Sequence, residues 1–511
     1  MVVRCLAVLV VVVSLCAAGI AQVASQNINM VSGTNWPAGD PYLQRQNEPS
    51  IAASSRNASR LLAGANDYRS VNIPAPAGVA DETGDAWLGV FKSFDGGATW
   101  QSNLLPGYPQ DISPQGLASP LHGLSTGADP VVRAGTNGMF YYSGIAFNRG
   151  TNVGKVFVAR YIDLANKENG DPIEYLDTAI IDQGTAGQFL DKPWLAVDIP
   201  RGPATCTIQA TQDGTQVSQT VPAGNIYLTY SDFVGGTNNV HTQILMTRST
   251  DCGQTWGKPV KISESYQVNQ GGTLAIDPQT GALYVAWRQF SNVNSSNAIL
   301  ISKSVDAGNS FSKPVTVQSL PDYDPNHPTA AAFFDQGISS STFRTNAFPA
   351  LAVDGTGRVY LAWSQRGVGP GGDARVVLST SPYGTSWTAP QAIDNAPAQD
   401  DFGSLFSRGD QLMPSLVFTE GTLTALYYDL RLDHTIGEFT PNNPFTGDMT
   451  SGAFYKEARS PLGDLPGSPN LVFTPFISDA GLSIRHTLDI RVSEANPADS
   501  PVFNSVYVSQ Y

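Results

Sequence analysis

Residues 271–290 read GGTLAIDPQTGALYVAWRQF, and residues 347–366 read AFPALAVDGTGRVYLAWSQR. Each stretch contains a short apolar segment, a turn with Gly, Asp and Thr, and a second segment that ends in aromatic residues. The second segments, such as 359–363, are rich in β-branched and aromatic residues and lack helical periodicity. Each stretch therefore predicts a pair of antiparallel strands.

The same unit recurs along the chain. Other copies begin at Asn47, Ala128, Asp191 and Met413, and the copy at Asp191 resumes at Gly224 after a long insertion. Successive anchor residues lie 63 to 81 positions apart: Pro49, Pro130, Pro193, Gly272, Pro349 and Pro414. Repeats of this length suit four-stranded units in a ring, which covers strand edges that an open sheet would expose. We therefore predict an all-β, six-bladed β-propeller with four-stranded antiparallel blades, and one further strand in the tail at 504–509.

A second motif runs in phase with the first. It reads SFDGGATW at 93–100, STDCGQTW at 249–256 and SVDAGNSF at 304–311, with a degenerate copy, TSPYGTSW, at 380–387. A hydroxyl and a carboxylate two residues apart can accept from the amides of a tight turn, and Gly permits positive φ. The terminal aromatic residue buries a large apolar area. We expect a structural role for Ser93, Asp95, Gly97, Trp100, Ser249, Asp251, Gly253, Trp256, Ser304, Asp306, Gly308 and Phe311.

These copies resemble the Asp-box, or BNR, repeats of the sialidase-like (neuraminidase-type) β-propeller family. The resemblance covers nearly the whole chain from residue 47 onward and implies one propeller domain over residues 27–511. It also implies an active site on the face opposite the boxes, where first strands begin and second strands end. The implied activity is that of an exported glycoside hydrolase of the exo-α-sialidase type. Its partner would be a glycan with a terminal sialic acid or another anionic sugar, and it would need no cofactor or metal.

The resemblance implies a particular set of site residues. In the family, three arginines grip the substrate carboxylate, a tyrosine is the nucleophile, a glutamate accepts its proton, and an aspartate is the acid/base. Read onto the corresponding strand ends, the substrate-binding residues are Arg69, Arg288 and Arg431. The catalytic residues are Tyr428 as nucleophile, Asp67 as acid/base and Glu48 as proton acceptor.

One departure from the family favours a different function. The family's Arg-Ile-Pro motif corresponds here to Asn47-Glu48-Pro49, which has no arginine at the matching position. Arginines at strand ends also pair readily with nearby aspartates, as in the segments 67–69 and 429–431. The alternative is a non-catalytic extracellular propeller that binds glycan or protein. A polysaccharide lyase is a third alternative, although the chain has only five histidines.

Composition and the N-terminus bear on location and partners. The chain has 511 residues, 14% of them charged, and a formal net charge of −14, which argues against nucleic acid and anionic membranes as partners. Residues 1–26 contain Arg4, an apolar run at 6–13 and a small-residue exit at 17–21, as in a secretory signal peptide. We expect a monomer that is secreted, or periplasmic, without stable membrane insertion.

Two further expectations concern the cysteines and the chain end. Cys206 and Cys252 lie outside the predicted signal, and an even pair in an exported chain predicts one disulfide. In the layout that the resemblance implies, both lie on the box face of one blade. The sequence stops directly after the predicted strand at 504–509, so a truncated reading frame remains open.

Overall fold

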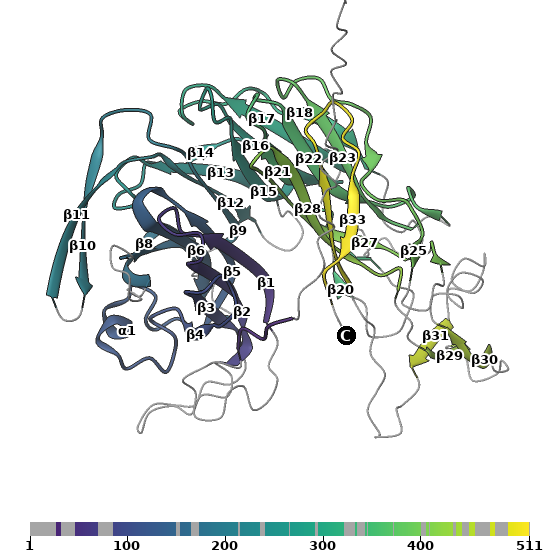
Figure 1. The fold of residues 1–511 in the computed structure, drawn as a ribbon, viewed down its shortest axis with the longest axis horizontal. Coiled ribbons are helices and arrows are strands. Elements are labelled where there is room, and N and C mark those ends of the chain that lie inside the picture. The colour runs from purple at the N-terminus through teal and green to yellow at the C-terminus, as the bar shows by residue number, and fades with distance from the viewer. Residues whose placement is uncertain are drawn as a thin grey trace, which may run out of the picture.

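Hydrogen bonds join most strands of the chain into six four-stranded antiparallel sheets, and the computed structural model is a six-bladed β-propeller (Figure 1). The innermost strands of successive blades pack in the order β1, β5, β9, β15, β21 and β27. The structure describes residues 27–31, 46–69, 85–149, 154–164, 173–185, 187–212, 215–235, 241–264, 266–291, 295–320, 333–334, 343–344, 346–370, 373–399, 405–407, 409–432, 436–441, 449–454, 471–475 and 489–509.

The first three blades contain the N-terminal half of the propeller. Blade 1 consists of β1 (Gln46–Ala53), β2 (Leu61–Asp67), β3 (Trp87–Ser93) and β4 (Gln101–Leu104). Blade 2 consists of β5 (Thr126–Ala134), β6 (Met139–Phe147), β7 (Gly154–Asp163) and β8 (Ile173–Gln183). Blade 3 consists of β9 (Gln188–Val197), β12 (Ile226–Val234), β13 (His241–Ser249) and β14 (Val260–Lys261).

The last three blades follow the same pattern. Blade 4 consists of β15 (Val268–Ile276), β16 (Leu283–Phe290), β17 (Ala298–Ser304) and β18 (Val315–Ser319). Blade 5 consists of β21 (Ala350–Val353), β22 (Val359–Gln365), β23 (Arg375–Ser381) and β24 (Gln391–Ala392). Blade 6 consists of β27 (Gln411–Thr419), β28 (Thr422–Asp429), β32 (Asp489–Ala495) and β33 (Asn504–Tyr507), so the strand predicted in the tail belongs to the sixth sheet.

Shorter elements lie outside the blades. They are the helix α1 (Pro114–Ala118), the pairs β19 (Phe333–Phe334) with β20 (Phe343–Arg344) and β25 (Ala398–Gln399) with β26 (Leu405–Phe406), and a sheet of β29 (Ile436–Pro441), β30 (Met449–Phe454) and β31 (Leu471–Pro475). No helix among the described residues is long and apolar enough to cross a membrane. The predicted signal peptide, 1–26, lies outside the described residues.

Apolar side chains between neighbouring blades form the core. Each of five such clusters joins one blade to the next, and fully buried tryptophans (Trp87, Trp287 and Trp363) belong to three of them. The second strands of blades 2 to 5 are buried nearly throughout, because both faces of these sheets pack against neighbouring blades. This explains why the predicted second strands are apolar on both faces rather than alternating.

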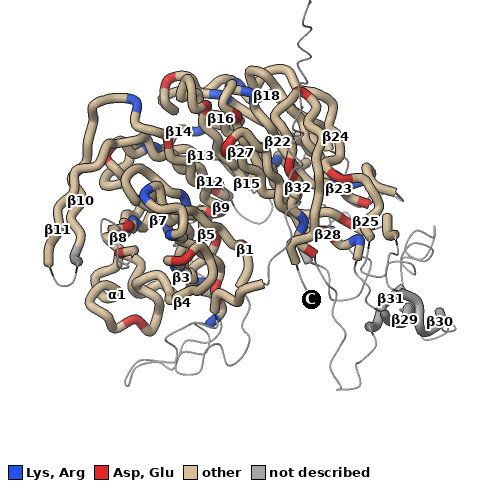
Figure 2. Tube along the Cα trace, viewed as in Figure 1, with Lys and Arg blue, Asp and Glu red and all other residues tan. Residues whose placement is uncertain are grey.

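The long insertion of blade 3 is a two-stranded ribbon of β10 (Thr205–Gln212) and β11 (Thr215–Pro222). Its strands contain no charged residue and are tan in Figure 2. Cys206 at its base forms the predicted disulfide with Cys252, which lies in the turn after β13. The disulfide therefore ties the ribbon to its own blade.

Removing this disulfide is expected to lower the free energy of unfolding by about 3–4 kcal/mol, because it closes a long loop in the unfolded chain. The two cysteines are separated by 46 residues and both are buried. Urea unfolding of the Cys206→Ser/Cys252→Ser variant, compared with the wild type, measures this difference. An unchanged unfolding midpoint would contradict the prediction.

The three motif copies share one hydrogen-bonded turn between the third and fourth strands of their blades. Ser304 Oγ accepts from the amide of Gly308 at 2.9 Å, and Asp306 Oδ1 accepts from the amide of Ser310 at 2.9 Å. Gly308 has a φ of 82°. The copies at 93–100 and 249–256 repeat these bonds. Their aspartates therefore bind backbone amides of their own turns.

Replacing Ser304 with alanine is expected to cost about 1–2 kcal/mol of stability, because it removes an acceptor from the buried Gly308 amide. Because the side chains of this turn bind the turn's own backbone amides, any activity per folded molecule is expected to stay unchanged. Denaturant unfolding and an activity assay on the same preparation test both parts. Loss of activity in a fully folded variant would contradict the structural role.

Candidate functional site

A β-bulge repeats near the start of the first strands, and the residue at this point has the same left-handed backbone conformation in every blade. The pairing of β1 with β2 shifts register between Asn47 and Ser50, and β5, β9, β15 and β27 show equivalent shifts. The residue at this point has a φ between 48° and 69° in all six blades: Glu48, Asp129, Lys192, Gly271, Ala347 and Met413. Because the backbone is alike in every blade, the blades differ here in side chain alone. In the first three the side chain is charged.

These three charged side chains meet. Lys192 Nζ donates to both carboxylate oxygens of Glu48 at 2.8 Å and to Asp129 Oδ1 at 2.9 Å. The Lys192 amide donates to Asp129 Oδ2 at 3.1 Å. The neighbouring Asp191 accepts from Gln270 Nε2 of blade 4 at 2.6 Å. We call Glu48, Asp129, Asp191 and Lys192 the Lys192 cluster. It joins the innermost strands of blades 1, 2 and 3.

The cluster contains three carboxyl groups and one ammonium, and this imbalance separates the pKa values of its members. Burial and the negative charge of Asp129 raise the pKa of Asp191 to about 8. Burial alone would raise the pKa of Asp129, but Lys192 and hydrogen bonds from Glu48 and Asp191 hold it below its usual range. Burial alone would lower the pKa of Lys192, but the three carboxyl groups raise it. At neutral pH, Asp129 and Lys192 are therefore ionised, and Asp191 is mostly protonated.

Glu48 is the member of the cluster that is most open to solvent. Its side chain is 44% exposed, compared with 26% for Lys192 and 9% for Asp129. Despite this exposure, desolvation by the surrounding protein and the charge of Asp129 raise the pKa of Glu48 to about 7. Glu48 can therefore both give and take a proton near neutral pH at a position that a solute can reach.

The spacing of the carboxyl groups suits acid–base chemistry. Oxygens of Glu48 and Asp129 bond to the same ammonium and to each other, so the charge of one carboxyl group acts directly on the pKa of the other. Titratable groups whose pKa values are pushed apart in one place are typical of a proton donor next to an ionised carboxylate. The cluster has that arrangement.

The structure places Asp67 and Arg69, predicted as acid/base and substrate-binding residue, against each other. Arg69 Nε and Nη2 donate to Asp67 Oδ2 at 2.9 and 2.5 Å, and the Arg69 amide donates to Asp67 Oδ1 at 3.0 Å. Arg69 also donates to Ser102 Oγ at 2.8 Å. Both Asp67 and Arg69 are buried within blade 1. Both side chains therefore bond to groups of blade 1, and their predicted roles toward a substrate stay predictions.

Arg288 and Arg431 are also buried and occupied within their own regions of the propeller. Arg288 Nη2 donates to Asn297 Oδ1 at 2.7 Å, and its guanidinium lies 4.7 Å from the ring centre of Phe290. Arg431 binds Asp429 and Asp394, as described below. Arg69, Arg288 and Arg431 are therefore each engaged by protein groups, and their shared role toward one ligand carboxylate stays a prediction. Different partners in blades 1, 4 and 6 hold them.

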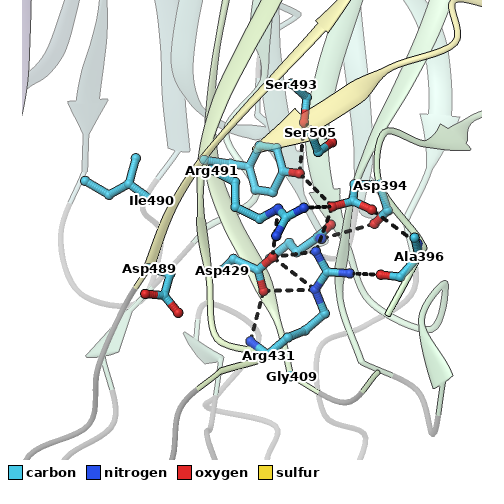
Figure 3. Close-up of polar contacts among 12 residues, drawn as sticks. Asp394, Ala396, Gly409, Asp429, Arg431, Asp489, Ile490, Arg491, Ser493 and Ser505 are labelled. Atoms are coloured by element: carbon cyan, nitrogen blue, oxygen red, sulfur yellow. Dashed lines mark hydrogen bonds and ion pairs between the residues drawn. The ribbon is translucent and has the colours of Figure 1, made fainter. Parts of the chain in front are cut away.

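Arg431 belongs to a buried network of four charges that joins blades 5 and 6 (Figure 3). Arg431 Nη2 lies 2.6 Å from Asp429 Oδ2 and 2.8 Å from Asp394 Oδ2. Arg491, on β32, also contacts Asp394 Oδ2, at 2.9 Å. Tyr427 Oη is 3.0 Å from Ser493 Oγ. Two arginines therefore balance two aspartates away from solvent. Asp394 and Arg491 were not among the residues that the sequence pointed to.

Tyr428, the predicted nucleophile, lies on β28 and is partly buried against Leu412 and Ala347. Burial raises the pKa of its hydroxyl above the usual value. The Glu48 carboxylate accepts hydrogen bonds from Lys192, and no bond to the Tyr428 hydroxyl is found among the described residues. The nucleophilic role of Tyr428 and the proton-acceptor role of Glu48 toward a tyrosine therefore stay predictions.

Comparison with known proteins yields matches to solved structures only. No family model matches the chain, and no curated protein matches it. The chain is similar to the α-L-arabinofuranosidase Arb93A of Fusarium graminearum at 15% identity and a TM-score of 0.41, over 76% of this chain and 90% of that chain. It is similar to the α-L-arabinanase of Penicillium chrysogenum at 14% identity and a TM-score of 0.40, over 76% and 89%. It is similar to the Trypanosoma rangeli sialidase at 13% identity and a TM-score of 0.39, over 76% and 53%.

Proposed function

We propose that this protein is an exported glycoside hydrolase and that the Lys192 cluster is its catalytic centre. The observation that carries the proposal is one ammonium, Lys192 Nζ, bonded to the carboxylates of Glu48 and Asp129, with a third carboxyl, Asp191, beside them. Glu48 gives its proton to the leaving oxygen, because it is exposed and its pKa is about 7. Asp129, ionised and close by, stabilises the positive charge that develops on the sugar ring until a water molecule adds to the anomeric carbon and gives its proton to Glu48.

The same charges favour a neutral sugar over an anionic one. With Asp191 mostly protonated and Lys192 paired with Glu48 and Asp129, the cluster offers no unpaired positive charge to an anionic sugar. Arg69 and Arg431, expected to offset such a charge, are bound to aspartates. The family resemblance alone implies specificity for sialic acid. On the charges described here, we propose a neutral terminal sugar as the substrate instead.

A panel of fluorogenic glycosides tests the proposal. The mature protein is incubated with neutral α- and β-glycosides, including an α-L-arabinofuranoside, and with an α-sialoside. We expect hydrolysis of at least one neutral glycoside and none of the sialoside. Hydrolysis of the sialoside alone would overturn the proposed sugar class. The absence of hydrolysis throughout, in protein shown to be folded, would overturn the enzymatic proposal.

A second candidate is a propeller that binds glycan without cleaving it. The observation that favours it is the neutralisation of strand-end arginines by adjacent aspartates, as in Arg69 with Asp67 and Arg431 with Asp429. Binding to an immobilised glycan array, without release of sugar from any fluorogenic glycoside, would favour this candidate. Turnover on any member of the panel would exclude it.

A further inference from the structure

Blade 4 has a glycine, Gly271, at the bulge position where the first three blades have charged side chains. The backbone does not require glycine there, since the other five blades hold non-glycine residues at this position with a φ between 48° and 59°. A neighbouring side chain does require it. A Cβ atom at residue 271 would lie 2.2 Å from Cδ1 and 2.6 Å from Cγ of Phe348. Carbon atoms in contact are about 3.5–4.0 Å apart, so the ring of Phe348 fills the space that a side chain at 271 would need.

Phe348 reaches this place from the next blade. It lies two residues before β21, the first strand of blade 5, and its ring covers the buried backbone of Gly271 in blade 4. The side chain stays partly exposed, and it is not among the described residues that form the five clusters between blades. The ring therefore presents an apolar surface to solvent and is not a part of the core.

The ring lies beside the Lys192 cluster. Gln270, the residue before Gly271, donates from Nε2 to Asp191 Oδ2 at 2.6 Å, and Asp191 directly precedes Lys192. The strands that hold these residues, β9 and β15, pack against each other. Both the cluster and Phe348 lie at the end of the propeller where the first strands begin. From blade 1 to blade 4, three charged bulge residues are thus followed by an aromatic ring in the fourth position.

We infer that Phe348 is a stacking platform for the sugar ring on which the Lys192 cluster acts, and this inference rests on the proposed function. A neutral sugar has C–H groups on a face of its ring and hydroxyl groups at the edge. The flat ring of Phe348 removes the C–H face from water, while the charged groups of the cluster bond to hydroxyls. Phe348 therefore selects neutral sugars in which the C–H groups of one face form a continuous apolar surface.

Calorimetric titration with cellobiose, maltose and arabinobiose tests the platform. The titrations use the full mature chain with Glu48→Gln, so that binding is measured without hydrolysis. Phe348→Leu keeps an apolar side chain but loses the flat face, and we expect it to raise the dissociation constant of the best-bound disaccharide about tenfold. Phe348→Tyr keeps the flat face and is expected to bind as the parent does. Circular dichroism of each variant checks the fold.

Two further variants show whether the ring itself is responsible. Gly271→Ala leaves Phe348 in the chain but displaces its ring, so we expect the same loss of binding as in Phe348→Leu. The double variant is expected to lose no more than either single one. The matched control is Tyr383→Ala, which removes an aromatic side chain that is 70% exposed on the turn between β23 and β24 of the same blade, at the opposite end of the propeller. This control is expected to leave binding unchanged.

Three results would overturn the inference. They are binding by Phe348→Leu as tight as that of the parent, an equal loss in Tyr383→Ala, and the absence of binding of all three disaccharides to folded parent protein. Failure of the proposed function is a separate result. Binding that depends on Phe348, in a protein that hydrolyses no glycoside of the panel, would keep the platform and reject the hydrolase.

Discussion

Replacement of Glu48 with glutamine is expected to lower kcat/KM for the hydrolysed glycoside by about 10²–10⁴-fold, because an amide cannot protonate the leaving oxygen. Glutamine keeps the shape of the side chain and can still contact Lys192, which bonds both carboxylate oxygens of Glu48 at 2.8 Å. The fold is therefore expected to survive. Initial rates on the best substrate of the panel, with circular dichroism of the same samples, measure the effect.

Glu420→Gln is the matched control for this substitution. Glu420 is also exposed and also has positive φ, at 48°, but it lies in the turn between β27 and β28, away from the Lys192 cluster. We expect this variant to retain wild-type activity. If Glu48→Gln retained full activity, the catalytic role of Glu48 would be wrong. If both variants lost activity equally, the loss would reflect charge or stability in general.

Replacement of Arg431 with methionine is expected to lower the free energy of unfolding by about 3–5 kcal/mol, because it leaves two buried carboxylates with a single arginine. Arg431 contacts Asp429 at 2.6 Å and Asp394 at 2.8 Å, and all three are buried. Arg491 alone would then balance both aspartates. Urea unfolding measured by fluorescence gives the difference.

Arg366→Met is the control for the loss of an arginine. Arg366 ends a second strand as well, but it is exposed, so the change in stability is expected to stay within about 0.5 kcal/mol. If Arg431→Met unfolded like the wild type but bound an anionic sugar less tightly, Arg431 would be a substrate-binding residue and not a part of the core.

The architecture was predictable because it depends on local pattern. The anchors from Pro49 to Pro414 mark six first strands, and the apolar, β-branched second strands match β2, β6, β12, β16, β22 and β28. The disulfide between Cys206 and Cys252 was also predictable, since only two cysteines lie outside the predicted signal. Both features need only the order of residues and the repeat length.

The hydrogen-bond partners of the arginines were harder to predict. Asp67 and Arg69 have the same spacing as Asp429 and Arg431, and both pairs fold alike, with the arginine amide and Nε donating to the aspartate. An arginine loses little conformational entropy when it pairs with an aspartate two residues away on the chain. A ligand carboxylate must instead be taken from solvent. The Asp-x-Arg spacing was therefore a signal for local pairing, which the sequence analysis raised as the alternative to substrate binding.

The Lys192 cluster depends on geometry that the sequence does not display. Glu48, Asp129 and Lys192 precede prolines and were recognisable as residues at strand starts. Their meeting depends on bulges with positive φ at residues that are not glycine, and such conformations are uncommon enough that no residue pattern predicts them. Gln270, which holds Asp191, belongs to the unit with Gly in place of Pro and carries no signal of its own.

The pH dependence of hydrolysis tests the central claim most directly. If Glu48 is the proton donor, kcat/KM falls as the pH rises through about 7, where Glu48 loses its proton. Because the positive charge of Lys192 lowers the pKa of Glu48, the Lys192→Met variant is expected to keep its residual activity to higher pH. A fall near pH 7 that moves upward in Lys192→Met supports the account. A fall elsewhere, or one that the substitution leaves in place, would contradict it.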